Sequence, residues 1–211
     1  MQEMHEINNL LIYKKLKRFY GSRHDWWPWG NSIFMPVSAI LTQATSWKNV
    51  EKAVRNLKSN NLDSIVKLLS IGEKKLAELI KPAGFYRQKA KRLRALLQLL
   101  HKHKRITRKK LLSLNGIGKE TADSILLYYF NRPYFVIDAY TKRFHKRLTG
   151  KDEKEYDKLA SIYGKGLSVR QMKEMHALIV EHSKHVCKKK PDCMACPLKD
   201  ICHYFIYEKR A

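Results

Sequence analysis

Apolar residues recur three and four positions apart over most of this chain, and that spacing limits the fold to packed helices. Four such segments follow one another at residues 49–59, 62–70, 73–81 and 87–103. They are separated by residues that end helices, namely Asn60 with Asn61, Gly72, and Pro82 with Gly84. The most strand-like stretch, residues 134–138, is short, and we interpret it as an extended link into the next helix. The sequence therefore predicts an all-α fold.

The charge of the chain points to a polyanionic partner. Among 211 residues, 43 Lys and Arg stand against 19 Asp and Glu, a formal net charge of +24. Repulsion of that size is costly unless an anion neutralises it, which makes nucleic acid the leading candidate. A basic proteome or a ribosome-associated protein is the alternative that charge leaves open. A membrane surface ranks lower, because no basic amphipathic helix stands apart from the rest.

The expected location is cytoplasmic and nucleoid-associated. No apolar run approaches the roughly 18 residues of a membrane span. The first residues are partly acidic and have helical apolar spacing, unlike a signal peptide. A nuclear or organellar form is the open alternative.

Residues 114–129, LNGIGKETADSILLYY, are typical of two helices joined by a tight turn. Gly116 and Gly118 permit positive φ and remove side-chain bulk between the helices. They also leave backbone N–H groups accessible at the start of the second helix, where an anion is favoured. In so basic a chain a DNA phosphate is the expected anion. The structural alternative is a hairpin that joins two helices and binds nothing.

All four cysteines, Cys187, Cys193, Cys196 and Cys202, fall within sixteen residues. A disulfide-bonded secreted protein would spread its cysteines over distant loops. The C-x5-C-x2-C-x5-C spacing instead predicts one metal site, with tetrahedral zinc or an iron–sulfur cluster as its occupant. In a zinc site, the nearby His185 or His203 could replace one thiolate.

The hairpin, followed twenty residues after Gly118 by Asp138, resembles the helix–hairpin–helix DNA glycosylases of the endonuclease III superfamily. Residues 38–53 look like the early helix pair of that family, and residues 80–93 like its Gly-Phe/Tyr turn and Lys-Ala helix. The cysteine segment looks like the [4Fe–4S] loop of many members. The resemblance implies two helical lobes, 23–131 and 1–22 plus 132–211, with DNA and the base pocket in a cleft between them.

The resemblance also implies the chemistry. In bifunctional members, a lysine before the Thr-Ala of the second hairpin helix forms a Schiff base with the sugar. Here that residue is Glu120, and Lys119 is rotated from it by about 100°. We therefore expect a glycosylase without AP lyase activity. Asp138 would stabilise the oxocarbenium charge and orient or deprotonate the attacking water. Its structural alternative, a helix N-cap, is compatible with catalysis.

The four tryptophans indicate the substrate. Residues 24–31, HDWWPWGN, together with Trp47, residues 118–129 and residues 179–184, resemble the 3-methyladenine DNA glycosylase branch. A methylated purine carries a positive charge that indole faces attract, and stacking offsets the cost of base flipping. The base then leaves as a neutral molecule. The expected substrates are 3-methyladenine and, second, 7-methylguanine. At least one tryptophan should belong to the core. The pocket implied by the resemblance comprises Trp26, Trp27, Pro28, Trp47 and Lys184.

DNA contacts are expected from three segments. Gln43 would fill the gap left by the flipped base, and the hairpin and the cysteine loop would bind phosphates. The residues concerned in these last two segments are Gly116, Ile117, Gly118, Lys119, Thr121, Lys188, Lys189 and Lys190. We expect a monomer that binds double-stranded DNA containing a damaged base.

Two departures keep alternatives open. The loop has one residue fewer between its first two cysteines than the family pattern, so zinc remains the alternative to a [4Fe–4S] cluster. The best-known 3-methyladenine branch lacks the loop, so a uracil, thymine-mismatch or adenine glycosylase is the alternative activity. A non-catalytic DNA-lesion-binding protein is the rival from another class, although it would leave Asp138 and the aromatic pocket without a purpose.

Overall fold

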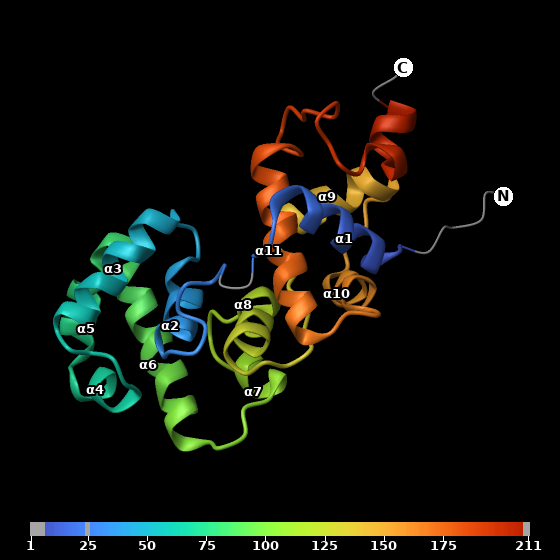
Figure 1. Ribbon diagram of the computed structural model, residues 1–211. Coiled ribbons are helices and arrows are strands. Elements are labelled where there is room, and N and C mark those ends of the chain that lie inside the picture. Colours follow the sequence, from blue (N-terminus) through green and yellow to red (C-terminus); the bar gives the residue numbers. More distant parts are fainter. Residues whose placement is uncertain (1–6, 24–25, 209–211) are drawn as a thin grey trace. The chain divides into compact units, whose positions relative to one another are not determined.

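The computed structural model describes residues 7–23 and 26–208. Throughout this part of the chain the regular elements are helical and none is a strand, as the apolar spacing predicted (Figure 1). The chain divides into two compact units. Unit 1 comprises Met1–Trp26 and Asn131–Ala211, and unit 2 comprises Trp27–Phe130. Among the described helices, none combines the length and the apolar character that crossing a membrane requires.

Unit 2 is built around a long helix that several shorter helices cover. Its elements are α2 (Phe34–Leu41), α3 (Trp47–Ser59), α4 (Ile65–Ser70), α5 (Glu73–Leu79), η1 (Lys81–Ala83), α6 (Tyr86–Lys102), α7 (Arg108–Leu112), α8 (Lys119–Ser124) and the π-helical turn η2 (Ile125–Tyr129). The long helix is α6, and α2, α4 and α5 pack against it.

The helices predicted within residues 49–103 are confirmed, with shifted ends. On α3 the apolar residues Val50, Ala53 and Leu57 are buried, so the three- and four-residue spacing marks the face that enters the core. The predicted helix 62–70 begins later, at Ile65, because the side chain of Ser64 accepts a hydrogen bond from the backbone N–H of Lys67 and caps it.

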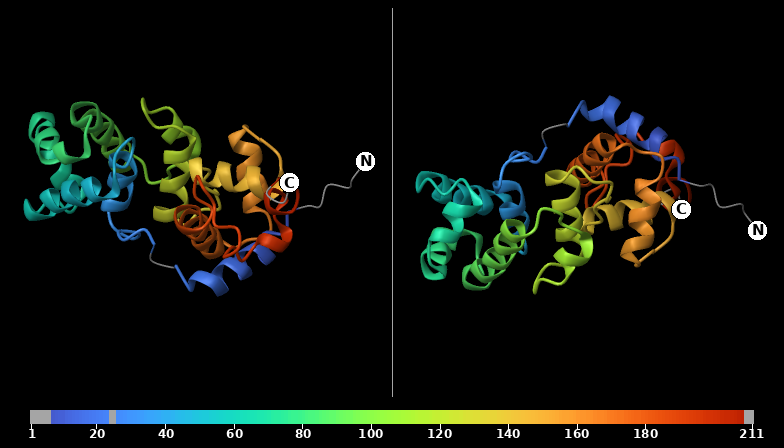
Figure 2. Two further views of the ribbon diagram at one scale, coloured as in Figure 1. Left: turned by 90° about the horizontal axis from the view of Figure 1, so that it is seen from above. Right: turned by 90° about the horizontal axis from the view of Figure 1, so that it is seen from below.

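Unit 1 joins both ends of the described chain around α11. Its elements are α1 (Asn9–Tyr20), α9 (Ala139–Thr149), α10 (Tyr156–Gly164), α11 (Val169–His185), η3 (Lys199–Ile201) and η4 (Tyr204–Glu208). α1 and α9 both pack against α11 (Figure 1; Figure 2). Residues 134–138 are neither helix nor strand, which confirms the predicted link into α9.

A buried carboxylate holds α1 against α11. Glu174 is fully buried and accepts hydrogen bonds from the hydroxyl of Tyr13, from Lys17 Nζ at 3.1 Å and from the backbone N–H of Arg23 at 3.0 Å. Burial alone would raise the pKa of Glu174, but these hydrogen bonds lower it to about 2. The carboxylate is therefore charged at neutral pH, and removing any partner would leave a buried charge less well satisfied.

Candidate active site and DNA-binding residues

Asp138 lies where the extended link meets α9. The link buries Phe135, Val136 and Ile137 in the core of unit 1, which fixes the backbone leading to the carboxylate. Asp138 Oδ1 accepts hydrogen bonds from the backbone N–H of Thr141 at 2.7 Å and from its hydroxyl at 2.9 Å. Asp138 is thus the N-cap of α9, and its side chain remains 16% exposed. The capping bonds orient one oxygen and hold the carboxylate rigidly.

The second oxygen of Asp138 faces a histidine that the sequence pattern did not single out. His176 Nε2, on α11, lies 3.6 Å from Asp138 Oδ2, and the histidine is only 3% exposed. The edge of its ring meets Trp26, with the ring centroids 5.4 Å apart. Burial raises the pKa of Asp138, but the interactions with His176 and Thr141 outweigh it and hold the pKa below its usual value. Asp138 is therefore a carboxylate at neutral pH.

The aromatic cluster of unit 2 comprises Trp27, Trp29, Trp47 and Tyr128. Trp27 is buried, donates from its indole N–H to Ser38 Oγ at 2.8 Å, and meets Trp47 and Tyr128 at centroid distances of 5.9 and 5.0 Å. Trp47 is 36% exposed and stacks on Trp29 at 5.3 Å. Trp27 thus serves mainly as a core residue, whereas Trp47 offers an accessible indole. Trp29 was not selected from the sequence, although it lies in the same tryptophan-rich run.

The other expected pocket residues have different surroundings. Trp26 belongs to unit 1, so the two consecutive tryptophans serve separate units. Pro28 is exposed in unit 2. Lys184 is exposed on α11, with its ammonium nitrogen 5.8 Å from the ring centroid of Tyr140.

The hairpin glycines have unequal roles. Gly116 has a φ of 78°, which favours glycine, and a Cβ there would lie 2.0 Å from Arg92 Nε, so the arginine side chain would have to move. Gly118 does not use the positive φ that glycine permits: its φ is −86°, and it is the N-cap of α8. Ile117 is buried and anchors the turn, while its N–H donates to the carbonyl of Leu114 at 3.1 Å. The remaining selected hairpin residues are exposed or half-buried: Lys119, Glu120 and Thr121.

Gln43 is bound to the hairpin in this structure. Its Nε2 donates to the carbonyl of Gly116 at 3.0 Å and to Thr121 Oγ1 at 3.1 Å. Its Oε1 accepts from Arg92 Nη1, on α6, at 2.8 Å. No local sequence pattern predicts these bonds, because they join three segments that are far apart along the chain.

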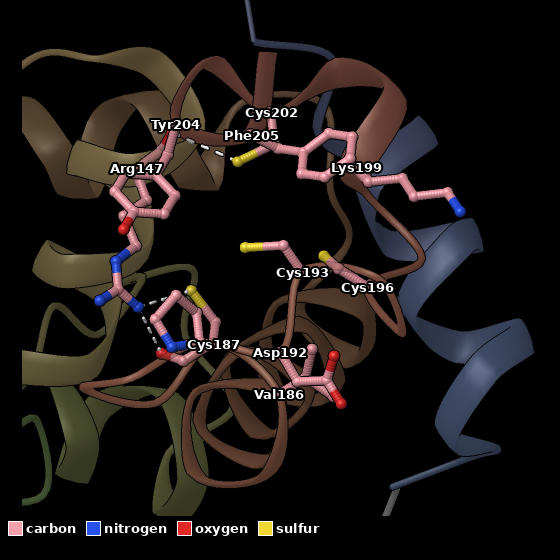
Figure 3. Close-up of a pocket in the computed structure, with 11 residues that line it drawn as sticks. Arg147, Val186, Cys187, Asp192, Cys193, Cys196, Lys199, Cys202, Tyr204 and Phe205 are labelled. Atoms are coloured by element: carbon pink, nitrogen blue, oxygen red, sulfur yellow. Dashed lines mark hydrogen bonds between the residues drawn. The ribbon is translucent and has the colours of Figure 1, made fainter. Parts of the chain in front are cut away.

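The four cysteines line one pocket of unit 1, and none forms a disulfide. Figure 3 shows their sulfur atoms around this pocket, and all four come from the segment that follows α11. Cys187 Sγ lies 3.4 Å from Arg147 Nη1, and Cys196 Sγ accepts from the backbone N–H of Leu198 at 3.4 Å. Such N–H donors to sulfur are typical of iron–sulfur sites.

Two arginines of α9 hold the first part of the cysteine loop. Arg147 donates to the carbonyls of Cys187, Lys188 and Lys189 at 3.0, 2.6 and 3.0 Å. Arg143, one helical turn earlier, donates to the carbonyl of Cys187 at 3.1 Å. The backbone of this segment is therefore fixed while its lysine side chains are exposed; they are Lys188, Lys189 and Lys190.

Four cysteine thiols are the ligand type and number that either an iron–sulfur cluster or tetrahedral zinc takes. Within residues 7–23 and 26–208, no three His, Cys, Asp or Glu side chains are close enough together to hold a metal ion. His185 and His203 do not line the pocket and instead lie 3.4 and 3.3 Å from Glu181 and Glu208.

Comparisons with known proteins agree with this arrangement. Residues 37–176 match the family described as HhH-GPD superfamily base excision DNA repair protein. A Methanocaldococcus jannaschii protein assigned as a DNA repair glycosylase is 49% identical over 207 residues, covering 90% of this chain and 94% of the relative. Endonuclease III of Rickettsia felis is 29% identical and covers 83% of this chain and 84% of its own.

A solved structure is also similar. The H. pylori 3-methyladenine DNA glycosylase MagIII, bound to 1,N6-ethenoadenine, superposes with a TM-score of 0.76 at 32% identity, covering 84% of this chain and 98% of the other. The helical fold, the hairpin and these matches define a DNA glycosylase of base excision repair. The chain belongs to the HhH-GPD superfamily.

Proposed function

We propose that this protein is a monofunctional glycosylase that flips alkylated purines out of double-stranded DNA and hydrolyses their N-glycosidic bond. The preferred substrate is 3-methyladenine, with 7-methylguanine second, and the product is an abasic site. The observation that carries the proposal is Asp138, a partly exposed carboxylate whose pKa is held low by His176 and Thr141.

Asp138 would do the chemistry. As the base departs, positive charge develops on the sugar, and a fixed carboxylate stabilises it without having to reorganise. The two bonds from Thr141 occupy Oδ1 and fix the plane of the carboxylate. The same group can orient a water molecule for attack on the sugar and accept its proton.

The aromatic cluster supports an alkylated purine as the substrate. Trp47 presents a partly exposed indole, and Trp29 stacks on it and limits its motion. A cationic purine would gain from stacking on such a ring, and the gain would offset the cost of extruding the base. The H. pylori structure, named as a 3-methyladenine glycosylase, adds support at 32% identity.

Position 120 supports the absence of AP lyase activity. Glu120 is exposed at the start of α8, where bifunctional members of the family have a lysine. A carboxylate cannot form the imine on which β-elimination depends. Hydrolysis by water at a site with Asp138 would then be the whole reaction. The cysteine loop is the feature that favours the alternative, a uracil, thymine-mismatch or adenine glycosylase.

The cysteine loop would hold a [4Fe–4S] cluster through Cys187, Cys193, Cys196 and Cys202. Bound there, the cluster would supply iron–thiolate bonds that fix the loop. Arg143 and Arg147 already bind the loop carbonyls, so its lysines would be presented to DNA phosphates on a rigid backbone. The proposed assembly is one protein molecule on damaged duplex DNA.

The direct test is release of free bases from methylated duplex DNA, separated by chromatography. The wild-type protein should release 3-methyladenine first and 7-methylguanine more slowly. The matched control is Asp138→Asn, which should bind the same DNA and release neither base. A wild-type protein that binds the DNA and releases no methylpurine would overturn the proposal.

A further inference from the structure

Arg92 occupies an unusual position in unit 2. It lies on α6 but reaches the hairpin, where its guanidinium fills the space beside Gly116 that any side chain at position 116 would need. Its Nη1 donates to Gln43 Oε1 at 2.8 Å. A charged donor thus has a neutral amide oxygen as its partner, in a chain whose net charge is +24.

The other half of the Gln43 amide is also engaged. Its Nε2 donates to the Gly116 carbonyl and to Thr121 Oγ1, so the side chain makes three hydrogen bonds and lies against the hairpin. A glutamine held in this way cannot reach beyond the surface of unit 2 until these bonds break. The bond from Arg92 is the only one of the three that involves a charged group, so it should contribute most to holding Gln43.

We propose that Arg92 is a phosphate-binding residue that exchanges Gln43 for a DNA phosphate, and that this exchange releases Gln43. The inference rests on the proposed function only in taking duplex DNA as the ligand. A phosphate accepts two parallel hydrogen bonds from a guanidinium and carries a full charge, so it competes well with a neutral amide oxygen. Binding of the DNA backbone at the hairpin would thereby free Gln43 only when DNA is present.

The exchange predicts that removing the Gln43 side chain strengthens DNA binding, although the residue is expected to contact DNA. In Gln43→Ala no bond to Arg92 has to break before a phosphate binds. This variant should therefore bind undamaged duplex DNA about three- to tenfold more tightly than wild type, the scale of one hydrogen bond. Arg92→Met should bind more weakly and reduce the slope of log K against log salt concentration by about one. In the Arg92→Met background, Gln43→Ala should give no further gain.

Lys91 provides the matched control. It is the exposed neighbour of Arg92 on α6, and no contact joins it to Gln43 among the described interactions. Lys91→Met removes the same charge from the same helix, and the gain from Gln43→Ala should persist in its background. Thermal unfolding and circular dichroism establish that each variant is folded.

If Arg92→Met does not fold, an NMR measurement on the wild-type protein tests the proposal. The side-chain amide signal of Gln43, assigned in NMR spectra by its loss in Gln43→Ala, should shift toward that of a solvated glutamine as undamaged duplex is added. Three results would each overturn the proposal. They are an unchanged Gln43 signal at saturating duplex, a Gln43→Ala variant that binds no more tightly than wild type, and a gain from Gln43→Ala that persists in Arg92→Met. Base release, measured in parallel, tests the glycosylase proposal separately, because all of these measurements use undamaged DNA.

Discussion

His176 Nε2 lies 3.6 Å from Asp138 Oδ2, although the two residues come from different helices of unit 1. The other oxygen of Asp138 is bound by Thr141, so both oxygens have a defined neighbour. Burial disfavours a charged carboxylate, and these neighbours reverse that effect. The relationship explains how a largely buried aspartate stays ionised, as electrostatic stabilisation of a sugar cation requires.

Asp138→Asn should lower the rate of base release by at least about 10²-fold, the scale of one positioned catalytic group. The asparagine oxygen can still accept the bonds from Thr141, so α9 keeps its N-cap. Melting temperature and affinity for duplex DNA should therefore stay near those of wild type. Single-turnover kinetics checks the rate, and wild-type activity in this variant would require another catalytic residue.

The pH dependence of the rate should show the low pKa of Asp138. A lowered pKa means that the carboxylate remains charged as the pH falls, so the rate should be lost only below the ordinary value of 3.8. The stability that the charged form contributes is likewise present above the unfolded-state pKa and lost as pH falls through the folded-state value. His176→Gln removes an interaction that lowers the pKa of Asp138 and keeps the burial that raises it. The fall in rate at acidic pH should therefore begin at a higher pH in His176→Gln than in wild type. Identical pH–rate profiles for the two proteins would show that His176 does not lower the pKa of Asp138.

The product of the reaction should be an intact strand with an abasic site, cut only after alkali or heat. Borohydride should trap no covalent adduct between the wild-type protein and damaged DNA, because Glu120 has no amine to form an imine. Denaturing electrophoresis with and without borohydride makes the measurement, and a bifunctional endonuclease III serves as the positive control. A trapped wild-type adduct would contradict the monofunctional assignment.

The purified protein should be yellow-brown, with broad absorption near about 400 nm from iron–thiolate charge transfer. Iron and sulfide analysis should give a [4Fe–4S] stoichiometry. Cys193→Ser should lose the absorption, because it replaces a thiolate that lines the pocket. A colourless protein that contains one equivalent of zinc would contradict the cluster and leave the phosphate-binding role of the loop intact.

Trp47→Ala should reduce methylpurine release about five- to thirtyfold with little loss of stability, because the ring is partly exposed and its stacking gain is modest. Trp47→Phe should recover part of the activity. Trp27→Ala is the contrasting variant. Its indole is buried and bonded to Ser38, so it should lose about 3–5 kcal/mol of unfolding free energy. Denaturant unfolding and kinetics separate the two effects, and equal losses of stability would show that both rings belong to the core.

The sequence predicted what depends on local spacing. Apolar periodicity predicted the helices around α3 and α6, and the position of Asp138 before α9 predicted its N-cap. Contacts between residues far apart in the sequence could not be predicted, because no local pattern marks them. His176 is one of three histidines on α11, and nothing in its spacing relates it to Asp138.

The two hairpin glycines also show what local sequence spacing does not predict. Both hairpin glycines permit a positive φ, and Gly116 has one, while the Arg92 side chain from another helix lies beside it. Gly118 has a neighbouring position and the same residue type, yet its backbone is extended. Which glycine adopts a positive φ depends on the backbone path of the turn, and the turn motif alone does not contain that information.

The central claim is that the protein removes a cationic methylated purine, and the most direct measurement compares single-turnover rates on duplexes that differ in one base. One duplex contains 7-methylguanine, and the others contain uracil, a thymine mismatch or normal adenine at the same position. The 7-methylguanine should be released far faster than the other bases, and Asp138→Asn should abolish its release. Rapid release of uracil, thymine or adenine while 7-methylguanine, and 3-methyladenine in methylated DNA, remain in place would contradict it.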